Sequence, residues 1–320
     1  MFRDYRISYF RRHVKIRETV PLSFLRQSVG YLLSYSARKI PHAAGITQLD
    51  VTRLVEYTSR GEDSPESSLD EKSVLKRAVR RNYSAFFLKA LAHAIYHVPC
   101  LNGFLEFSLL RNGGTLYHAE DINFSFTVHT KFGVIKPIVR NPHQKDIETV
   151  ANEMRDLTRK ARRTDPDELY HAAARALAWS ALRELDPRAV FGFLFWMREI
   201  LFSRRRTPRE FQDIPPEQKL RVEDVLGATC TLANIGMMVS GHQTVTVIIP
   251  PEVTMFGLGD MHLAPRVVDG KVVPRWVITL CATMDHRAYD AGEAFPLYNH
   301  LVRYIENPAL IYEWKPGDPI

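Results

Sequence analysis

Helical and strand-like patterns follow one another irregularly along this chain, and that order constrains its fold more than any single motif. Apolar residues recur with helical spacing in five segments, at 22–33, 84–98, 146–163, 168–185 and 292–306. Strand-like runs occur at 46–51, 104–110, 122–128, 134–139, 229–233, 244–249, 255–259 and 275–284. The regular alternation of a Rossmann sheet is missing, as are the G-x-G-x-x-G and P-loop motifs. We therefore expect a mixture of helices and strands that is not a nucleotide-binding Rossmann domain.

The bulk composition indicates a globular protein with a sizeable core. Of 320 residues, 45% are hydrophobic and 25% are charged. The net charge of +7 is concentrated in arginine-rich patches near 3–17, 159–163 and 204–206. Such patches attract nucleic acid, anionic membranes or phosphorylated cofactors, but solvated basic faces are the commoner outcome. We therefore predict no nucleic-acid partner.

The cysteines and the start of the sequence bear on the cellular compartment. Cys100, Cys230 and Cys281 lie far apart in apolar surroundings, which is typical of buried thiols in a reducing compartment. The first residues carry charge but no apolar leader, and no run reaches about 18 apolar residues. We expect a cytoplasmic protein without a spanning helix.

The segment 164–223 differs in character from the rest of the chain. It combines an alanine-rich helical pattern, nine successive apolar residues at 189–197, three arginines at 204–206 and a proline-rich linker at 207–218. The stretch 189–206 is too short to span a bilayer, but it fits peripheral membrane contact, packing on another subunit or an acyl pocket. Packing of a buried helical hairpin is the favoured interpretation.

Residues 285–290 (DHRAYD) are the main candidate for chemistry, since they follow an apolar strand-like run at 276–281. Histidine side chains in general change charge near neutrality, so His286 is suited to take a proton from a thiol or hydroxyl. A nearby carboxylate would fix its tautomer, or would pair with Arg287 and stiffen the loop. An ordinary surface turn is an equally good interpretation of this stretch taken alone.

A second pair of histidines, His93 and His97, has the four-residue spacing of a metal pair on a helix. The sequence offers no third ligand, so structural or surface histidines are favoured and no metal site is predicted.

Several short motifs, in order, resemble the catalytic domain of the 2-oxoacid dehydrogenase acyltransferases (the E2 components) and, more distantly, chloramphenicol acetyltransferase. The matching motifs are PLSFLR at 21–26, IPH at 40–42, LDVTRL at 49–54, VPCLN at 98–102, GVIKPIVR at 133–140, TLANIG at 231–236, PP at 250–251 with GLG at 257–259, and D-H-R-x-x-D at 285–290. Each motif is weak alone, but the ordered set covers most of the chain outside 1–18 and 164–223.

The resemblance implies a two-layer, mixed-sheet α/β fold of the chloramphenicol acetyltransferase-like type, with a helical insertion at about 164–223. It divides the chain into a basic N-terminal arm (1–18) and a single acyltransferase-like domain (19–320) that the insertion interrupts. It also implies a homotrimer, which in the family can build a larger cubic assembly, with active sites in channels between subunits. Coenzyme A or acyl-CoA would enter from one end and a second thiol from the other.

The same resemblance assigns roles to individual residues. His286 would be the general base that deprotonates a thiol or hydroxyl acceptor for attack on an acyl thioester. Asp290 would support the base or its loop, and Asp285 and Arg287 would support the loop. Thr231, Ala233 and Asn234 occupy the motif that stabilises the oxyanion in the family.

Three departures from the family pattern accompany these roles. Ala233 stands where the family has a serine whose hydroxyl stabilises the oxyanion, and such a donor is typically worth about 10²–10³ in turnover. Thr231, on the same strand face, would substitute only if the backbone shifted. Ala291 stands where a glycine follows the final aspartate, which would bend the loop differently. We also find no lipoyl domain, so a lipoyl group would come from a separate protein.

Three functions follow as hypotheses, the third being a membrane-associated acyltransferase for a long-chain acyl group, prompted by the stretch 189–206. The first is a CoA-dependent acyltransferase that uses His286. The alternative is a weakened or inactive relative that acts as an oligomeric scaffold or binding module, because Ala233 lacks the hydroxyl. The sequence specifies neither the acyl group nor the acceptor.

Overall fold

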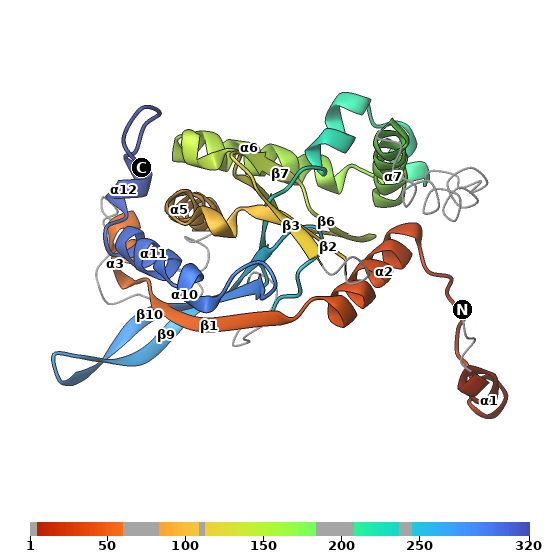
Figure 1. Ribbon diagram of the computed structural model, residues 1–320, viewed down its shortest axis with the longest axis horizontal. Coiled ribbons are helices and arrows are strands. Elements are labelled where there is room, and N and C mark those ends of the chain that lie inside the picture. The colour runs from red at the N-terminus through yellow and green to blue at the C-terminus, as the bar shows by residue number, and fades with distance from the viewer. Residues whose placement is uncertain (1–4, 60–82, 109–112, 184–207, 237–244) are drawn as a thin grey trace.

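A six-stranded sheet is the centre of the fold (Figure 1). The computed structural model describes residues 5–59, 83–108, 113–183, 208–236 and 245–320. In spatial order the strands are β1 (His42–Asp50), β10 (Lys271–Asp285), β9 (Thr254–Val268), β8 (Cys230–Asn234), β4 (Asn123–Phe126) and β7 (Ile138–Arg140). β8 runs parallel to both of its neighbours, β9 and β4, whereas the other pairs are antiparallel. The sheet is therefore mixed, as predicted.

β9 and β10 form a long hairpin that extends beyond the rest of the sheet (Figure 1). At its tip, Asp269 and Gly270 have φ angles of 50° and 75°. Two successive residues with positive φ match the twist of the flanking strands, and Asp-Gly is a preferred pair for such a turn. The predicted turn at 268–271 is confirmed.

The predicted strand at 134–139 is wrong as a single element. It is divided between β6 (Gly133–Ile135), which pairs with β5 (Val128–Thr130), and β7, which pairs with β4. Pro137 lies at the division. Its carbonyl accepts a hydrogen bond from the Phe126 N–H, but proline has no N–H to continue a ladder. A separate ribbon is formed by β2 (Gly103–Ser108) and β3 (Gly113–His118).

The predicted strand at 244–249 is also wrong for the residues that the structure describes, 245–249, which are in no strand. Thr246 and Ile248 are buried whereas Val245 and Val247 are exposed, so the burial alternates as it would in a strand. Hydroxyl groups take the place of ladder bonds: Ser36 Oγ donates to the Ile248 carbonyl at 2.5 Å, and Thr246 Oγ1 lies 2.7 Å from Thr283 Oγ1.

Helices cover one face of the sheet. α5 (Tyr83–His97) lies between α6 (Ile147–Arg162) and α11 (Pro296–Glu306), and α3 (Thr52–Ser59) and α12 (Ala309–Tyr312) adjoin them (Figure 1). α5 is buried along almost its whole length, from Tyr83 to Ile95. Because apolar residues occur on all of its sides, it packs on the sheet and on its helical neighbours at once. The 3₁₀ helix η1 (Pro99–Leu101) follows it, at the proline that the sequence predicts to end the helix.

α2 (Phe24–Lys39) packs against α7 (Pro166–Arg183) away from the helical layer (Figure 1). Ser23 caps α2 by accepting a hydrogen bond from the Arg26 N–H. The Phe24 and His171 rings stack 3.6 Å apart, and the Leu25 N–H donates to Asp167 Oδ1 at 2.8 Å. The predicted basic arm contains a helix, α1 (Tyr5–His13), which stands apart from the rest of the molecule.

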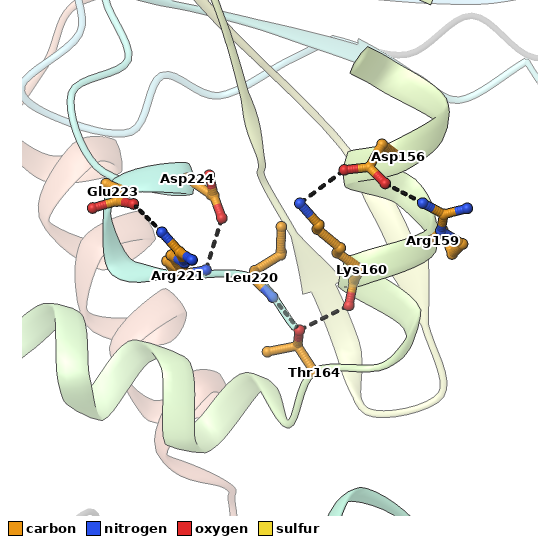
Figure 2. A network of polar contacts seen from close by, with 8 residues as sticks. All are labelled: Asp156, Arg159, Lys160, Thr164, Leu220, Arg221, Glu223 and Asp224. Carbon is orange, nitrogen blue, oxygen red and sulfur yellow. Dashed lines mark hydrogen bonds and ion pairs between the residues drawn. The ribbon is translucent and has the colours of Figure 1, made fainter. Parts of the chain in front are cut away.

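The two ends of the predicted insertion 164–223 meet beside α6 (Figure 2). The Leu220 N–H donates to Thr164 Oγ1, which in turn donates to the Lys160 carbonyl, each at 2.8 Å. Within the insertion the structure describes α7, α9 (Arg209–Gln212), η4 (Pro216–Gln218) and η5 (Val222–Asp224). Residues 184–207, including the whole stretch 189–206 for which membrane contact is considered, lie outside the described residues. In the described part, no helix is both long enough and apolar enough to cross a bilayer.

Candidate active site

The turn at the end of β10 is built on a buried ion pair. Asp285 is the last residue of β10, pairs with His42 of β1 and is buried. Arg287 binds its carboxylate through two nitrogens, with Nε 2.9 Å from Oδ1 and a terminal nitrogen 2.6 Å from Oδ2. The Arg287 N–H also donates to Oδ1 at 3.0 Å. Hydrogen bonding to Asp285 raises the pKa of Arg287. Two parallel N–H···O bonds fix the geometry of this contact and so hold the turn.

His286 projects from this turn with about half of its side chain exposed, 48%. Its backbone N–H donates to the Pro41 carbonyl at 3.1 Å, which anchors the turn to the start of β1. Its Nδ1 lies 3.3 Å from Asp290 Oδ1, and the Asp290 side chain is 79% exposed. A carboxylate at Nδ1 favours the tautomer with its proton there, which leaves the lone pair of Nε2 as the base.

Asp290 has a second role as the N-cap of the short helix α10 (Ala291–Ala294). Its N–H donates to Glu293 Oε2 at 2.8 Å, and its carbonyl accepts from the Glu293 N–H at 3.1 Å. Ala291 is the first residue of this helix and does not have positive φ, so alanine is unstrained there. The predicted final helix, 292–306, is divided into α10 and α11 at Phe295 and Pro296.

Tyr289, which sequence reasoning missed, fastens the turn to β9. Its ring is buried, and its hydroxyl lies 2.5 Å from Thr254 Oγ1 and 3.3 Å from the Val253 carbonyl. Burial raises the pKa of this phenol well above its ordinary value, so it remains a neutral hydrogen-bonding group. The sequence feature that could have indicated this buried anchor is an aromatic residue among the mostly polar residues of 285–290.

Ala233 lies in β8 in an apolar environment. It is only 5% exposed and packs with Ile40, Ile248 and Met255. The neighbouring Asn234 points to the other face of the strand, where its Nδ2 donates to Ser84 Oγ at 2.9 Å. The structure therefore places Asn234 away from the side of the sheet that Ala233 faces.

Thr231 shares the face of Ala233 and belongs to a buried polar network that the sequence did not reveal. Its Oγ1 donates to Glu252 Oε2 at 2.6 Å and lies 2.7 Å from Ser125 Oγ. Lys136 Nζ donates to the same Thr231 oxygen at 3.2 Å and lies 3.4 Å from Glu252 Oε1. The signal for this network in the sequence was a charged residue in each of two otherwise apolar runs: Lys136 before Pro137 and Glu252 after Pro251.

Ala233 and His286 are far apart within one chain. Ala233 pairs with Gly257 of β9, and Gly257 pairs with Cys281 of β10, so these residues form one row across the sheet. His286 lies five residues beyond Cys281 along the chain. With strands about 4.8 Å apart and a rise of about 3.3 Å per residue, His286 is roughly 19 Å from Ala233. On this estimate the two positions are too far apart to share one reacting carbonyl within a single chain.

The other predicted residues lie away from this turn. His93 is buried on α5 between the rings of Tyr304 and Trp314, while His97 stacks on His300. No group of three or more metal-binding side chains gathers among the residues that the structure describes. A cavity of about 1010 Å³ between α3, α11 and α12 is lined by residues such as Arg53 and Arg303. None of the predicted site residues lines it, so we do not associate it with the chemistry.

Comparisons with known proteins agree with the fold and the motifs. The family model for the 2-oxoacid dehydrogenases acyltransferase (catalytic domain) matches residues 15–169 and 209–313, on both sides of the insertion. The acetyltransferase component of the pyruvate dehydrogenase complex from Staphylococcus epidermidis (a dihydrolipoyllysine-residue acetyltransferase) is 22% identical over 293 residues. That alignment covers 92% of this chain and 52% of the relative, so the chain spans about half the length of the curated relatives it matches.

Two solved structures have the same fold. One comes from a study of a serine, a histidine and an asparagine in the catalytic mechanism of Azotobacter vinelandii dihydrolipoamide acetyltransferase. It has a TM-score of 0.65 and 22% identity, and the alignment covers 94% of this chain and 96% of that one. The other is the cubic core of a pyruvate dehydrogenase multienzyme complex, with a TM-score of 0.64, 21% identity, and coverage of 94% and 96%. The predicted fold class is confirmed, and with most of its length matched this chain belongs to the 2-oxoacid dehydrogenase acyltransferase (catalytic domain) family.

Proposed function

We propose that this chain is a CoA-dependent acyltransferase in which His286 is the general base. The observation that carries the proposal is the His286–Asp290 pair, held on a turn that the Asp285–Arg287 ion pair makes rigid. In the Azotobacter vinelandii acetyltransferase the histidine and the asparagine studied for catalysis are four residues apart, the same separation as His286 and Asp290 here. An asparagine oxygen and an aspartate oxygen both accept a hydrogen bond from Nδ1–H.

The proposed reaction moves an acyl group between two thiols. Nε2 of His286 takes the proton of the acceptor thiol, and the thiolate attacks the carbonyl carbon of the acyl thioester. The resulting tetrahedral intermediate carries an oxyanion. Its collapse breaks the original carbon–sulfur bond, and the departing thiolate recovers the proton from His286. Coenzyme A is one thiol, and the other is a lipoyl group on a separate protein or another thiol acceptor.

We further propose that the working unit is an oligomer, with a homotrimer as the simplest form and a cubic assembly as a larger one. The separation of roughly 19 Å between Ala233 and His286 supports this, because a site that uses both positions needs two chains. Solved relatives include the cubic core of a pyruvate dehydrogenase complex. In such a site, His286 of one subunit would face β8 of the next.

Acyl exchange between acetyl-CoA and dihydrolipoamide tests this function. Replacement of His286 by Ala removes the base, so we expect the rate to fall by about 10²-fold or more. His300→Ala is the matched control, because His300 lies on α11 and stacks on His97 away from the turn. Exchange that His286→Ala leaves unchanged would contradict the role of the base.

The alternative, a weakened or inactive scaffold, is favoured by one observation: Ala233 offers no hydroxyl and lies among apolar side chains. This alternative predicts oligomers that form normally but exchange little, and a marked gain of exchange in Ala233→Ser. Robust exchange by the unmodified protein would exclude it.

A further inference from the structure

The polar network beside Ala233 contains Lys136, whose ammonium group has one N–H donor that no described residue accepts. The Lys136 side chain is 21% exposed, whereas that of its partner Glu252 is only 7% exposed. An ammonium group has three N–H donors. Among the residues that the structure describes, Thr231 and Glu252 take two of them, so one donor is left for a group that reaches Lys136 from the exposed side.

The strand register places Lys136 level with Ala233. In the antiparallel pair of β4 and β7, Ser125 lies opposite Ile138, and two residues further along this register Thr127 lies opposite Lys136. In the parallel pair of β4 and β8, Ser125 lies opposite Thr231, so Thr127 lies opposite Ala233. The Thr127 N–H donates to the Leu232 carbonyl at 3.3 Å, which supports the continued register.

The Lys136 ammonium is also close to Ala233 along β8. It lies 3.2 Å from the Thr231 hydroxyl, and Thr231 precedes Ala233 by two residues on the same strand face. Side chains two residues apart on one face are about 6.6 Å apart. An atom at the edge of Ala233 nearest Thr231 is therefore within reach of the lysine after a small change of rotamer.

We propose that Lys136 is a catalytic residue that stabilises the oxyanion in place of the hydroxyl that Ala233 lacks. This inference rests on the proposed acyltransferase function. As the thiolate adds to the thioester carbonyl, the free N–H of Lys136 donates to the developing oxyanion, and Glu252 and Thr231 hold the ammonium in position. When the intermediate collapses and the other thiolate leaves, the carbonyl reforms and Lys136 keeps its proton. A charged donor forms a stronger hydrogen bond than a neutral hydroxyl does.

An alternative role for Lys136 is only to neutralise the buried Glu252. Four variants separate the two roles in the exchange assay: Lys136→Met, the double variant Lys136→Met/Glu252→Gln, the triple variant that adds Ala233→Ser, and Lys131→Met as the matched control. Lys131 is an exposed lysine in the adjacent turn, and it pairs with the exposed Glu210. The double variant leaves no buried carboxylate unpaired, so it remains informative if Lys136→Met alone does not fold.

We expect the double variant to lose about 10²-fold in kcat with little change in KM, because the lost contact exists only in the transition state. Adding Ala233→Ser should restore kcat at least tenfold, since a hydroxyl would again face the oxyanion. A folded double variant with wild-type kcat, or a loss that Ala233→Ser does not relieve, overturns the inference while the His286 result stands. Absence of exchange in the unmodified protein overturns the proposed function, and this inference with it.

Discussion

At the scale of single residues, the contact between Asp285 and Arg287 has a large expected effect on stability. Asp285 is buried, so an Arg287→Met substitution leaves its carboxylate without a countercharge. We expect a loss of about 3 kcal/mol in the free energy of unfolding, measured by urea denaturation. Adding Asp285→Asn to that variant should recover at least half of the loss, because the unpaired charge is then gone.

The control for this prediction is a second ion pair, made by Arg275 of β10, the strand that ends at Asp285. Arg275 pairs with Asp50 at 3.0 Å, but both side chains are partly exposed. Arg275→Met should therefore cost less than about 1 kcal/mol. Equal losses in Arg275→Met and Arg287→Met would show that burial does not set the strength of the Asp285–Arg287 pair.

Residues close together in the sequence were predictable, and residues paired across the sheet were not. His286, Asp290, Asp285 and Arg287 belong to one short motif, and in the structure His286 contacts Asp290 and Arg287 contacts Asp285. Lys136 and Glu252 are 116 residues apart, and neither belongs to a recognisable spacing. Only the strand register makes them neighbours, and register depends on the whole sheet rather than on a local pattern.

At the scale of elements, α5 was predictable because its apolar pattern is long and ends at a proline. Some strand predictions were wrong, because the predicted strand at 134–139 is divided and residues 245–249 are in no strand. Residues 245–249 alternate in burial, so their sequence looks like a strand, but side-chain hydroxyls of Ser36 and Thr283 hold the segment instead of a neighbouring strand. Apolar alternation reports which side chains are buried, and it does not report whether the backbone has a hydrogen-bonding partner.

His93, one of the buried polar side chains on α5, predicts that stability depends on pH. His93 is 1% exposed, and its pKa is lowered to about 3 by burial and by the nearby Lys89, His143 and His97. Between pH 6.5 and about 3 the unfolded chain binds a proton at His93 that the folded chain does not bind, so acid favours unfolding. From this residue alone we expect a loss of about 2 kcal/mol at pH 5 relative to pH 7.5.

Urea denaturation of His93→Phe at the two pH values measures this contribution. Phenylalanine keeps a ring against Tyr304 and Trp314 but cannot bind a proton, so the variant should lose less stability on acidification than the unmodified protein. His118→Phe, at an exposed position in β3, should keep the full pH dependence. If both variants respond to acid alike, His93 is not the group responsible.

At the scale of the whole molecule, the sheet separates the two halves of the proposed site. His286 leaves the sheet at the end of β10, whereas Ala233 and Lys136 lie two or more strands away. The separation follows from strand order and register, which the individual motifs do not reveal. We therefore propose that a site built from both halves combines His286 of one subunit with Lys136 of another, and subunit mixing can test this proposal.

Two inactive variants should complement each other in mixed oligomers. His286→Ala keeps Lys136, and Lys136→Met/Glu252→Gln keeps His286, so a site between unlike subunits can contain both groups. When equal amounts of the two variants mix at random in a closed ring, each site needs one subunit that keeps His286 beside one that keeps Lys136. About a quarter of the sites then contain both groups. We expect the mixture to recover about that share of wild-type exchange after subunits have been dissociated and reassembled. A site within one chain predicts only the average of the two parent activities, because every chain in the mixture then lacks one of the two groups.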